Sequence, residues 1–262
     1  MRIVVCIKQV PASSKVEVDP ENGTLKRVGT ETKTNPYDLF AIETALRLRE
    51  KLGGTVTALT MGPRQAGEMM LDAYQMGVDE AAVLSDRKFA GSDVLATSYT
   101  LSLGIRALGG ADLIICGRQT TDGDTAQIGP AVAEHLGIPH AAWVSGVESA
   151  TPEEICVRQE LASVVQVSAM RYPCLITVEK DIFVPRLPSY RLRLATADRA
   201  VKYLSFEDLP EQNLSRCGLI GSPTSVERMF PPAPSTGQIY LEGSGPEKAD
   251  RLFEQLLNRK LL

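Results

Sequence analysis

The first half of the chain alternates short, apolar runs rich in β-branched residues with longer stretches that carry an apolar residue every three or four positions. The short runs have the composition of buried strands, and the longer stretches have the period of amphipathic helices. Such alternation predicts an α/β fold, in which a parallel sheet is covered by helices on both faces. The predicted strands are Ile3–Lys8, Thr55–Met61, Glu80–Ser85 and Leu113–Cys116.

Glycine, proline and short polar residues mark the ends of the predicted helices. Asn35 followed by Pro36 is typical of an N-cap and a first helical position, and Gly53-Gly54 ends the helix that follows. Gly77 is suited to the left-handed position after the second helix. The predicted helices run from Pro36 up to Gly53, from Gly62-Pro63 to Gln75, from Ser92-Asp93 to Leu108, and from Gln127 to Leu136.

The second half has a different pattern, which predicts antiparallel strands added to the sheet. Four strand-like runs follow one another across short turns, at Ala142–Val147, Ile155–Leu161, Ser163–Val167 and Leu175–Val178. After Lys180, prolines and a basic series predict an extended arm that ends in a helix from Pro246 to about Lys260. We therefore expect an α/β domain over residues 1–180, and a partner-docking loop with a C-terminal arm over residues 181–262.

Composition narrows the classes of function. The 262 residues carry a net charge of −4, which gives no global basic surface for nucleic acid. The chain contains no run of 18 apolar residues, which is the length that a membrane-spanning helix needs. Its N-terminus enters a predicted strand without a charged leader, so we expect a cytoplasmic protein. Five scattered cysteines and two histidines form no metal-binding spacing, so no metal site is expected.

The strongest candidate site is the loop from Gly117 to Gln127, which lies between a predicted strand and a predicted helix. Unpaired N–H groups and the positive end of a helix dipole favour an anion there, and small residues let the backbone approach a phosphate. The alternative is plain capping, because Asp124 and Gln127 have the spacing of a capping box. The loops after Ile7 and Thr60 are expected at the same edge of the sheet.

Other chemistries lack their sequence motifs. The chain has no phosphate-binding G-x-x-x-x-G-K-[ST] motif, no G-x-G-x-x-G after the first strand and no G-x-S-x-G nucleophile motif. Asp122 and Asp124 form an acid/base pair in one interpretation, but Arg118 is close and the loop contains no histidine. For these two aspartates, a role as helix cap or as ligand of a ribose is favoured over acid/base chemistry. The loop is therefore predicted to be a binding site without catalytic residues of its own.

The segment Val184–Arg191 is a second candidate, because it places one apolar residue, Leu187, between two prolines and beside arginines. An apolar anchor on a stiff loop with a cationic rim suits docking to an acidic partner surface. The simpler alternative is a solvated linker that proline stiffens.

Together these pieces resemble the β subunit of electron transfer flavoproteins. The resemblance covers most of residues 1–205 in the right order and is specific only as a set. The residues that carry it are Val5–Pro11, Asn35–Asp38 with Glu43, Gly62-Pro63, Met76-Gly77, Gly117–Pro130, Pro173–Val178 and Pro185–Ser189.

The resemblance implies a Rossmann-like fold of the adenine nucleotide hydrolase-like type and a heterodimer with an α subunit. It further implies that Leu187 anchors a partner dehydrogenase. The positions that match the family's nucleotide contacts are Cys6, Asn35, Pro36, Tyr37, Asp38, Met61, Gly117, Arg118, Gln119, Thr120, Thr121, Asp122, Gly123, Asp124, Thr125, Ala126, Gln127 and Ile128.

Within that family, the small Thr125-Ala126 pair is similar to the electron-bifurcating type, in which the β subunit holds FAD rather than AMP. That type implies NADH as electron donor (or NAD as acceptor), a flavin-dependent dehydrogenase of the acyl-CoA or 2-hydroxy acid type, and ferredoxin or flavodoxin as low-potential acceptor. Two alternatives stay open: a structural subunit that holds only AMP, and an AMP- or ATP-binding module of the universal-stress type.

Overall fold

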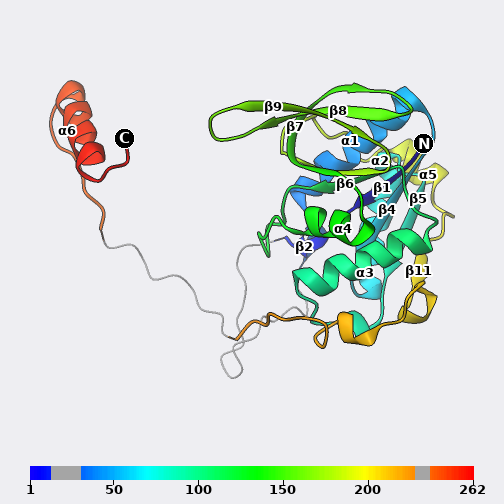
Figure 1. The fold of residues 1–262 in the computed structure, drawn as a ribbon. Helices are drawn as coiled ribbons and strands as arrows, with labels where there is room; N and C mark the ends of the chain where they lie inside the picture. The colour runs from blue at the N-terminus through cyan, green and yellow to red at the C-terminus, as the bar shows by residue number, and fades with distance from the viewer. Residues whose placement is uncertain (13–30, 228–236) are drawn as a thin grey trace.

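The computed structural model describes residues 1–12, 31–227 and 237–262. Within them, one mixed sheet has the strand order β11-β5-β4-β1-β6-β10-β7-β8-β9, and β2 pairs with β3 in a small antiparallel ribbon (Figure 1). The strands are β1 (Arg2–Cys6), β2 (Gln9–Pro11), β3 (Thr32–Thr34), β4 (Thr55–Met61), β5 (Glu80–Leu84), β6 (Leu113–Gly117), β7 (His140–Ala150), β8 (Glu154–Glu160), β9 (Val165–Arg171), β10 (Cys174–Val178) and β11 (Lys202–Leu204).

The helices begin and end close to the residues that the sequence marks. The second predicted helix differs in its start, because a short 3₁₀ turn at Arg64–Ala66 precedes the α-helical part. Gly77 takes the expected left-handed conformation, with φ of 115°. The α-helices are α1 (Pro36–Leu52), α2 (Gly67–Met76), α3 (Val94–Ala107), α4 (Ile128–Leu136), α5 (Tyr190–Ala195) and α6 (Gly245–Asn258).

The strands from β11 to β7 in this order are all parallel, and only β8 and β9 run antiparallel to their neighbours. From β1 the chain moves outward through β4 to β5, and then returns to place β6 on the other side of β1. The connections after β1 and β6 therefore leave the sheet in opposite directions. Such a switch point opens a crevice at the carboxyl edge of a parallel sheet.

Helices cover both faces of the sheet, because successive side chains of each strand point to opposite faces. Ile3 and Val5 of β1 pack in the core with α1 and α2, whereas Val4 and Cys6 pack in the core with α3 and α4. The predicted α/β class, with a mostly parallel sheet and antiparallel additions, is confirmed. No helix in the described ranges is both long and apolar enough to cross a bilayer.

The second half corrects the strand predictions in one respect. The runs at Ala142–Val147 and Leu175–Val178 were expected as antiparallel additions, but β10 lies between β6 and β7 and is parallel to both. The antiparallel addition is limited to β8 and β9. The periodicity of a strand reports which residues are buried and does not identify the neighbouring strand, so the sequence could not place β10.

The segment after residue 180 also differs from the expected extended arm. It forms the short helix α5, and β11 then joins the main sheet beside β5. Farther on, Asp93 accepts hydrogen bonds from the N–H and the hydroxyl of Thr224, which attaches this segment to the start of α3. The division of the chain at residue 180 stays a prediction. The predicted last helix is present as α6 and lies apart from the sheet in Figure 1.

Candidate nucleotide crevice and the Leu187 loop

Three segments meet at the switch point between β1 and β6. They are the exit of β1 at Lys8, the first turn of α1, and residues 117–128, which we call the β6–α4 loop. Asn35 and Asp38 contact both other segments through hydrogen bonds. The structure thus brings together most of the residues that the sequence singled out as nucleotide contacts.

Gly117 permits the close approach of α1 to the end of β6. A Cβ atom at this position would lie 2.4 Å from Oδ1 of Asp38 and 2.7 Å from the carbonyl carbon of Tyr37. Because one of these atoms belongs to the backbone, a larger residue would push the start of α1 away from the sheet. Gly129 is similar, since a Cβ there would lie 2.2 Å from Thr177 of β10.

Asn35 occupies the N-cap of α1, as predicted, but its side chain makes no capping hydrogen bond. Instead the amide nitrogen donates to the carbonyl of Gln119 at 2.9 Å, and the amide oxygen accepts from the N–H of Thr121 at 3.3 Å. The side chain is completely buried. Asn35 therefore holds the β6–α4 loop against α1, a long-range role that the local sequence does not reveal.

Asp38 lies in the first turn of α1 and is buried beneath the same loop. Its Oδ2 accepts the N–H of Lys8 at 2.7 Å. Burial raises the pKa of this carboxyl to about 7, although hydrogen bonds from the Asn35 side chain and from the N–H groups of Lys8 and Gly117 act to lower it. The switch point thus holds a buried carboxyl group whose pKa lies near 7.

Two aspartates of the loop already have partners. Asp122 forms an ion pair with Nζ of Lys8 at 2.7 Å. Burial acts to raise the pKa of Asp122, but the hydrogen bond and charge of Lys8 hold it below its usual value. Asp124 accepts a hydrogen bond from the amide of Gln119. Sequence reasoning did not assign Lys8 to the site, although it stands directly after Cys6-Ile7 in the residues that carry the resemblance.

The end of the loop has an unusual backbone and leaves the helix start uncapped. Asp124 and Ala126 have φ angles of 51° and 56°, and for residues other than glycine this conformation costs about 1 kcal/mol each. The helix α4 has Gln127 at its N-cap, with no side-chain cap. The alternative of a capping box at Asp124 and Gln127 is therefore wrong. Within the described ranges, no side chain caps the start of α4, and an uncapped helix start is the arrangement of an anion site.

Arg118 borders the crevice on the side of β10. Its Nη1 bonds Glu179 at 2.6 Å, and its guanidinium lies 4.3 Å from the centre of the Trp143 ring. Trp143 has a φ of 59° and sits where the register of β7 against β10 shifts, so a bulge turns this bulky residue toward Arg118. The sequence did not assign Glu179 or Trp143, because their approach depends on the position of β10.

Two of the predicted nucleotide contacts, Cys6 and Met61, lie away from the β6–α4 loop, the first buried within β1 and the second farther along the carboxyl edge of the sheet. Cys6 and Cys116 are register partners at the ends of β1 and β6, and both are buried free thiols. The hydrogen bond with the neighbouring Cys6 thiol, together with burial, raises the pKa of Cys116. Met61 ends β4, one strand beyond β1. In the described ranges, no three metal-ligating side chains gather into a cation site.

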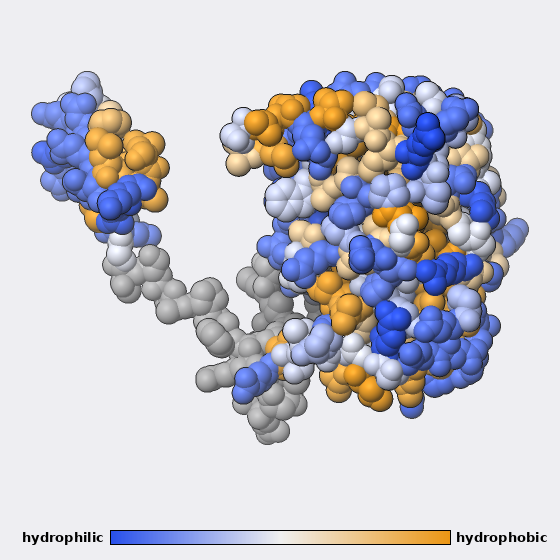
Figure 2. Space-filling view, viewed as in Figure 1, coloured by the Kyte–Doolittle hydropathy of each residue, from blue (hydrophilic) through white to orange (hydrophobic). Residues whose placement is uncertain are grey.

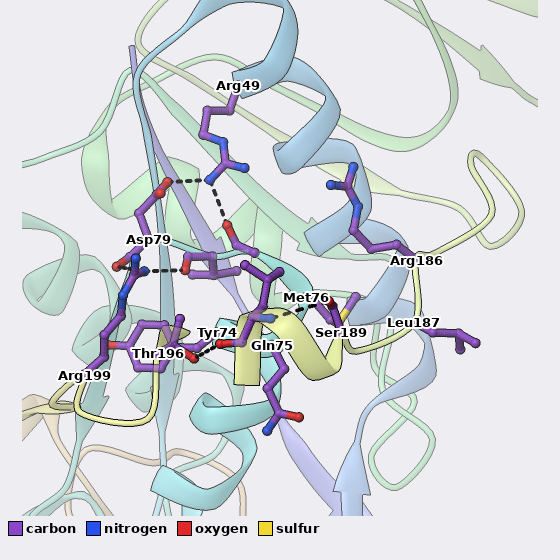
Figure 3. Close-up of a pocket in the computed structure, with 13 residues that line it drawn as sticks. Arg49, Tyr74, Gln75, Met76, Asp79, Arg186, Leu187, Ser189, Thr196 and Arg199 are labelled. Carbon is purple, nitrogen blue, oxygen red and sulfur yellow. Dashed lines mark hydrogen bonds and ion pairs between the residues drawn. The ribbon is translucent and has the colours of Figure 1, made fainter. Parts of the chain in front are cut away.

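Leu187 lies far from this crevice, on residues 183–189, which we call the Leu187 loop. The loop borders a pocket of about 280 Å³ near the amino edge of the sheet (Figure 3). The residues that precede β5 and the last turn of α1 line this pocket, and α1 connects the two regions. The lining includes Arg49, Arg186 and Arg199, of which Arg49 is paired with Asp79.

Comparisons with known proteins agree with this arrangement. A family described as "Electron transfer flavoprotein domain" matches residues 22–209. The chain is 42% identical to Protein FixA of Bradyrhizobium diazoefficiens, over 98% of this chain and 91% of the relative. It is 42% identical to the electron transfer flavoprotein subunit beta of Clostridium acetobutylicum, over 87% of each.

A third relative belongs to a named reductase complex. The caffeyl-CoA reductase-Etf complex subunit CarD of Acetobacterium woodii is 38% identical to this chain, over the full length of both. This full-length match spans the sheet, the β6–α4 loop and the Leu187 loop together. The chain is therefore a member of the electron transfer flavoprotein family, among relatives named as its β subunit.

Proposed function

We propose that this chain is the β subunit of an electron-bifurcating electron transfer flavoprotein and holds FAD in the crevice between β1 and β6. The observation that carries the proposal is the uncapped start of α4 beneath a loop whose Asp124 and Ala126 have left-handed backbone conformations. Left-handed conformations at residues other than glycine cost free energy and cluster at functional sites, which supports a ligand at this loop. A diphosphate would satisfy the free N–H groups there.

The side chains present fit that group. Thr125 and Ala126 are small, so the backbone near them is accessible to a bulky anion. The nearby carboxylates do not oppose an anion strongly, because Asp122 is paired with Lys8 and Asp124 accepts from Gln119. The stack of Arg118 on Trp143 provides a cationic and aromatic wall for the rest of the nucleotide.

When bound, the flavin supplies the redox chemistry, and the protein supplies position and electrostatics. In this proposal Asn35 keeps the loop closed against α1, Gly117 allows that closure, and Asp38 holds a proton at the floor of the crevice near neutral pH. None of these residues is assigned a bond-making role.

The electron route follows from the proposed subunit type. NADH would deliver electrons, and a flavin-dependent dehydrogenase of the acyl-CoA or 2-hydroxy acid type and a ferredoxin or flavodoxin would accept them. The relative from Acetobacterium woodii is named for a caffeyl-CoA reductase complex, and one from Anaerotignum propionicum is named as an electron transfer subunit of acryloyl-CoA reductase. Both names support a CoA-linked partner for this chain.

Two exposed apolar surfaces support an α subunit as the permanent partner. The apolar side chains of α6 gather on one face, at Leu252, Phe253 and Leu257, and its other face is polar (Figure 2). The hairpin of β8 and β9 also exposes Val165 and Val167 on the edge strand of the sheet. Surfaces of this kind are costly in water and mark association sites.

The direct test is the cofactor content of the chain purified together with its α subunit. Acid release followed by chromatography measures FAD and AMP per heterodimer. Two FAD and negligible AMP are expected, one FAD for each subunit. One FAD with one AMP would overturn the assignment of FAD to this chain and leave a structural subunit. A stable nucleotide-bound monomer without flavin would support the universal-stress alternative.

The Thr125→Arg variant tests the location of the site. Its long side chain fills the space in front of α4, so the FAD content of the heterodimer should fall from two to one. Ala197→Arg adds the same charge to an exposed position near the Leu187 loop and should keep both flavins. An unchanged flavin content in Thr125→Arg would place the cofactor elsewhere.

A further inference from the structure

Leu187 is held out into solvent by a loop that is itself fixed. Its side chain is 86% exposed, and it points away from that of Arg186 in Figure 3. A single exposed leucine needs no explanation. Here, however, the residues on both sides of the leucine are held by specific contacts, so the exposure is a fixed property of the loop.

The central contact of the loop is made by Glu43, in the second turn of α1. Its side chain is only 3% exposed, yet both carboxylate oxygens are occupied. Oε2 accepts from the backbone N–H of Arg186 at 3.1 Å and from its Nε at 2.8 Å. Oε1 accepts from Nη2 of Arg186 at 3.2 Å and from Nε of Arg47 at 2.8 Å. Glu43 thus grips both the side chain and the backbone of the residue next to Leu187.

The contact between Glu43 and Arg186 is an ion pair in which both side chains stay charged. The arginines hold the pKa of Glu43 below its usual value despite burial, and the carboxylates of Glu43 and Glu50 raise the pKa of Arg186. Both groups therefore stay charged across the physiological range. Because the Arg186 side chain stays 33% exposed, the pair contributes little net stability, and its geometry is set by the hydrogen bonds to both carboxylate oxygens.

Two further contacts fix the ends of the loop. The guanidinium of Arg47 lies 4.6 Å from the centre of the Phe183 ring. At the other end, the N–H of Ser189 donates to the carbonyl of Gln75 at 2.9 Å, which attaches the loop to the end of α2. Leu187 is therefore presented from a frame that α1 and α2 build together.

We propose that Glu43 is a positioning residue that pre-organises the Leu187 loop for docking to the partner dehydrogenase. In this proposal the loop has the same conformation when free and when docked. Binding then avoids the entropy cost of ordering the anchor. This inference rests on the proposed function, because it assumes that Leu187 is the docking anchor. It concerns association only, since Glu43 lies outside the candidate nucleotide crevice.

The test uses the heterodimer as the varied electron donor of the flavin-dependent dehydrogenase that accepts its electrons. Glu43→Gln keeps the shape of the side chain but replaces one acceptor with a donor that faces arginine. Its KM for the heterodimer should rise about fivefold to tenfold at unchanged kcat and unchanged FAD content. Glu50→Gln is the matched comparison, because Glu50 accepts from the Arg186 side chain at 2.7 Å and, among the described contacts, not from its backbone. Its effect should therefore be smaller.

A double variant separates positioning from a general structural role. If Glu43 acts through Leu187, then Glu43→Gln added to Leu187→Ala should raise KM no further than Leu187→Ala alone. Fully additive effects would overturn the proposal. If Leu187→Ala alone leaves KM unchanged, the docking role of the loop fails first, and this result is distinguishable from a failure of Glu43 alone.

Hydrogen exchange gives a readout that does not depend on the partner. In the Glu43→Gln heterodimer, the amide of Arg186, which donates to Glu43, should exchange faster than in wild type, whereas those of β1 and β6 should not change. Equal protection of the loop would overturn the proposal. Should Glu43→Gln fail to fold, Arg186→Lys serves instead and should raise KM in the same way, because a lysine lacks the planar fork with which Arg186 bonds Glu43 and Glu50.

Discussion

Asp38 and Glu43 are buried carboxylates on the same helix, and they support two different kinds of surface. Asp38 accepts mainly backbone N–H groups, and burial raises its pKa to about 7. Glu43 lies between two arginines, which hold its pKa below the usual value. Beside Asp38, the start of α4 lacks a side-chain cap; beside Glu43, every carboxylate oxygen is bonded and an apolar side chain is exposed instead.

In the proposed function, one scaffold serves two tasks. A ligand site keeps N–H donors free for an anion. Strained backbone and carboxyl groups with a pKa near neutrality are also typical of such sites. A surface that presents an anchor satisfies its polar groups internally, so that only the apolar contact remains to be made. The helix α1 has 17 residues, about 25 Å of length, which connect the two regions rigidly.

The largest expected effect is that of Gly117→Ala, which tests whether the crevice depends on close packing. The added methyl group would meet Asp38 and the backbone of Tyr37, so we expect a loss of about 3 kcal/mol in the free energy of unfolding, with loss of bound nucleotide. Urea unfolding measures the first effect. Gly123→Ala is the control in the same loop, since its Cβ would lie 3.5 Å from Thr120. Equal stability of the two variants would show that α1 can move.

The pH dependence of stability separates the two carboxylates. The folded pKa of Asp38 is raised from 3.8 to about 7, so its favourable contribution is complete below pH 3.8 and is lost as pH rises through 7. Wild type should lose about 2 to 3 kcal/mol between pH 5 and pH 8 relative to Asp38→Asn. Denaturant unfolding at both pH values measures it. The exposed Asp198→Asn serves as control, and identical slopes for wild type and Asp38→Asn would contradict the raised pKa.

Glu43 should behave in the opposite way. Because its folded pKa is lowered, its contribution is present above the unfolded value of 4.5 and is lost only as pH falls through the folded pKa. Within pH 5 to 8, Glu43→Gln should therefore shift stability by a constant amount. A slope in that window would mean that Glu43 is not fully charged.

The smallest expected effect is that of Lys8→Met. Its ion pair with Asp122 is partly exposed, at 45% and 31% for the two side chains, so the loss of stability should be below about 1 kcal/mol. The effect on nucleotide affinity should be larger than the effect on stability. Without Lys8, the carboxylate of Asp122 is unpaired beside the proposed phosphate position and repels the phosphate. Titration calorimetry at low and high salt measures this effect. Lys180→Met is the control for loss of one positive charge.

Local sequence determined the elements whose ends are marked by glycine, proline or short polar residues. Thr55–Met61 was predicted with the bounds that the structure shows, and α1 begins at Pro36 as expected. The β6–α4 loop was also identified from its own residues, because small side chains between a buried strand and a helix are a local pattern. These features depend on neighbours in sequence, and the chain encodes them directly.

The tertiary structure alone decided the contacts between distant segments. It placed β10 between β6 and β7, brought Arg118 to Trp143, and turned Asn35 from an expected cap into the residue that holds the β6–α4 loop. It also joined Glu43 to Arg186 across 143 positions of the chain. Periodicity shows which face of an element is buried, but only the packed sheet determines which residues meet at its edges.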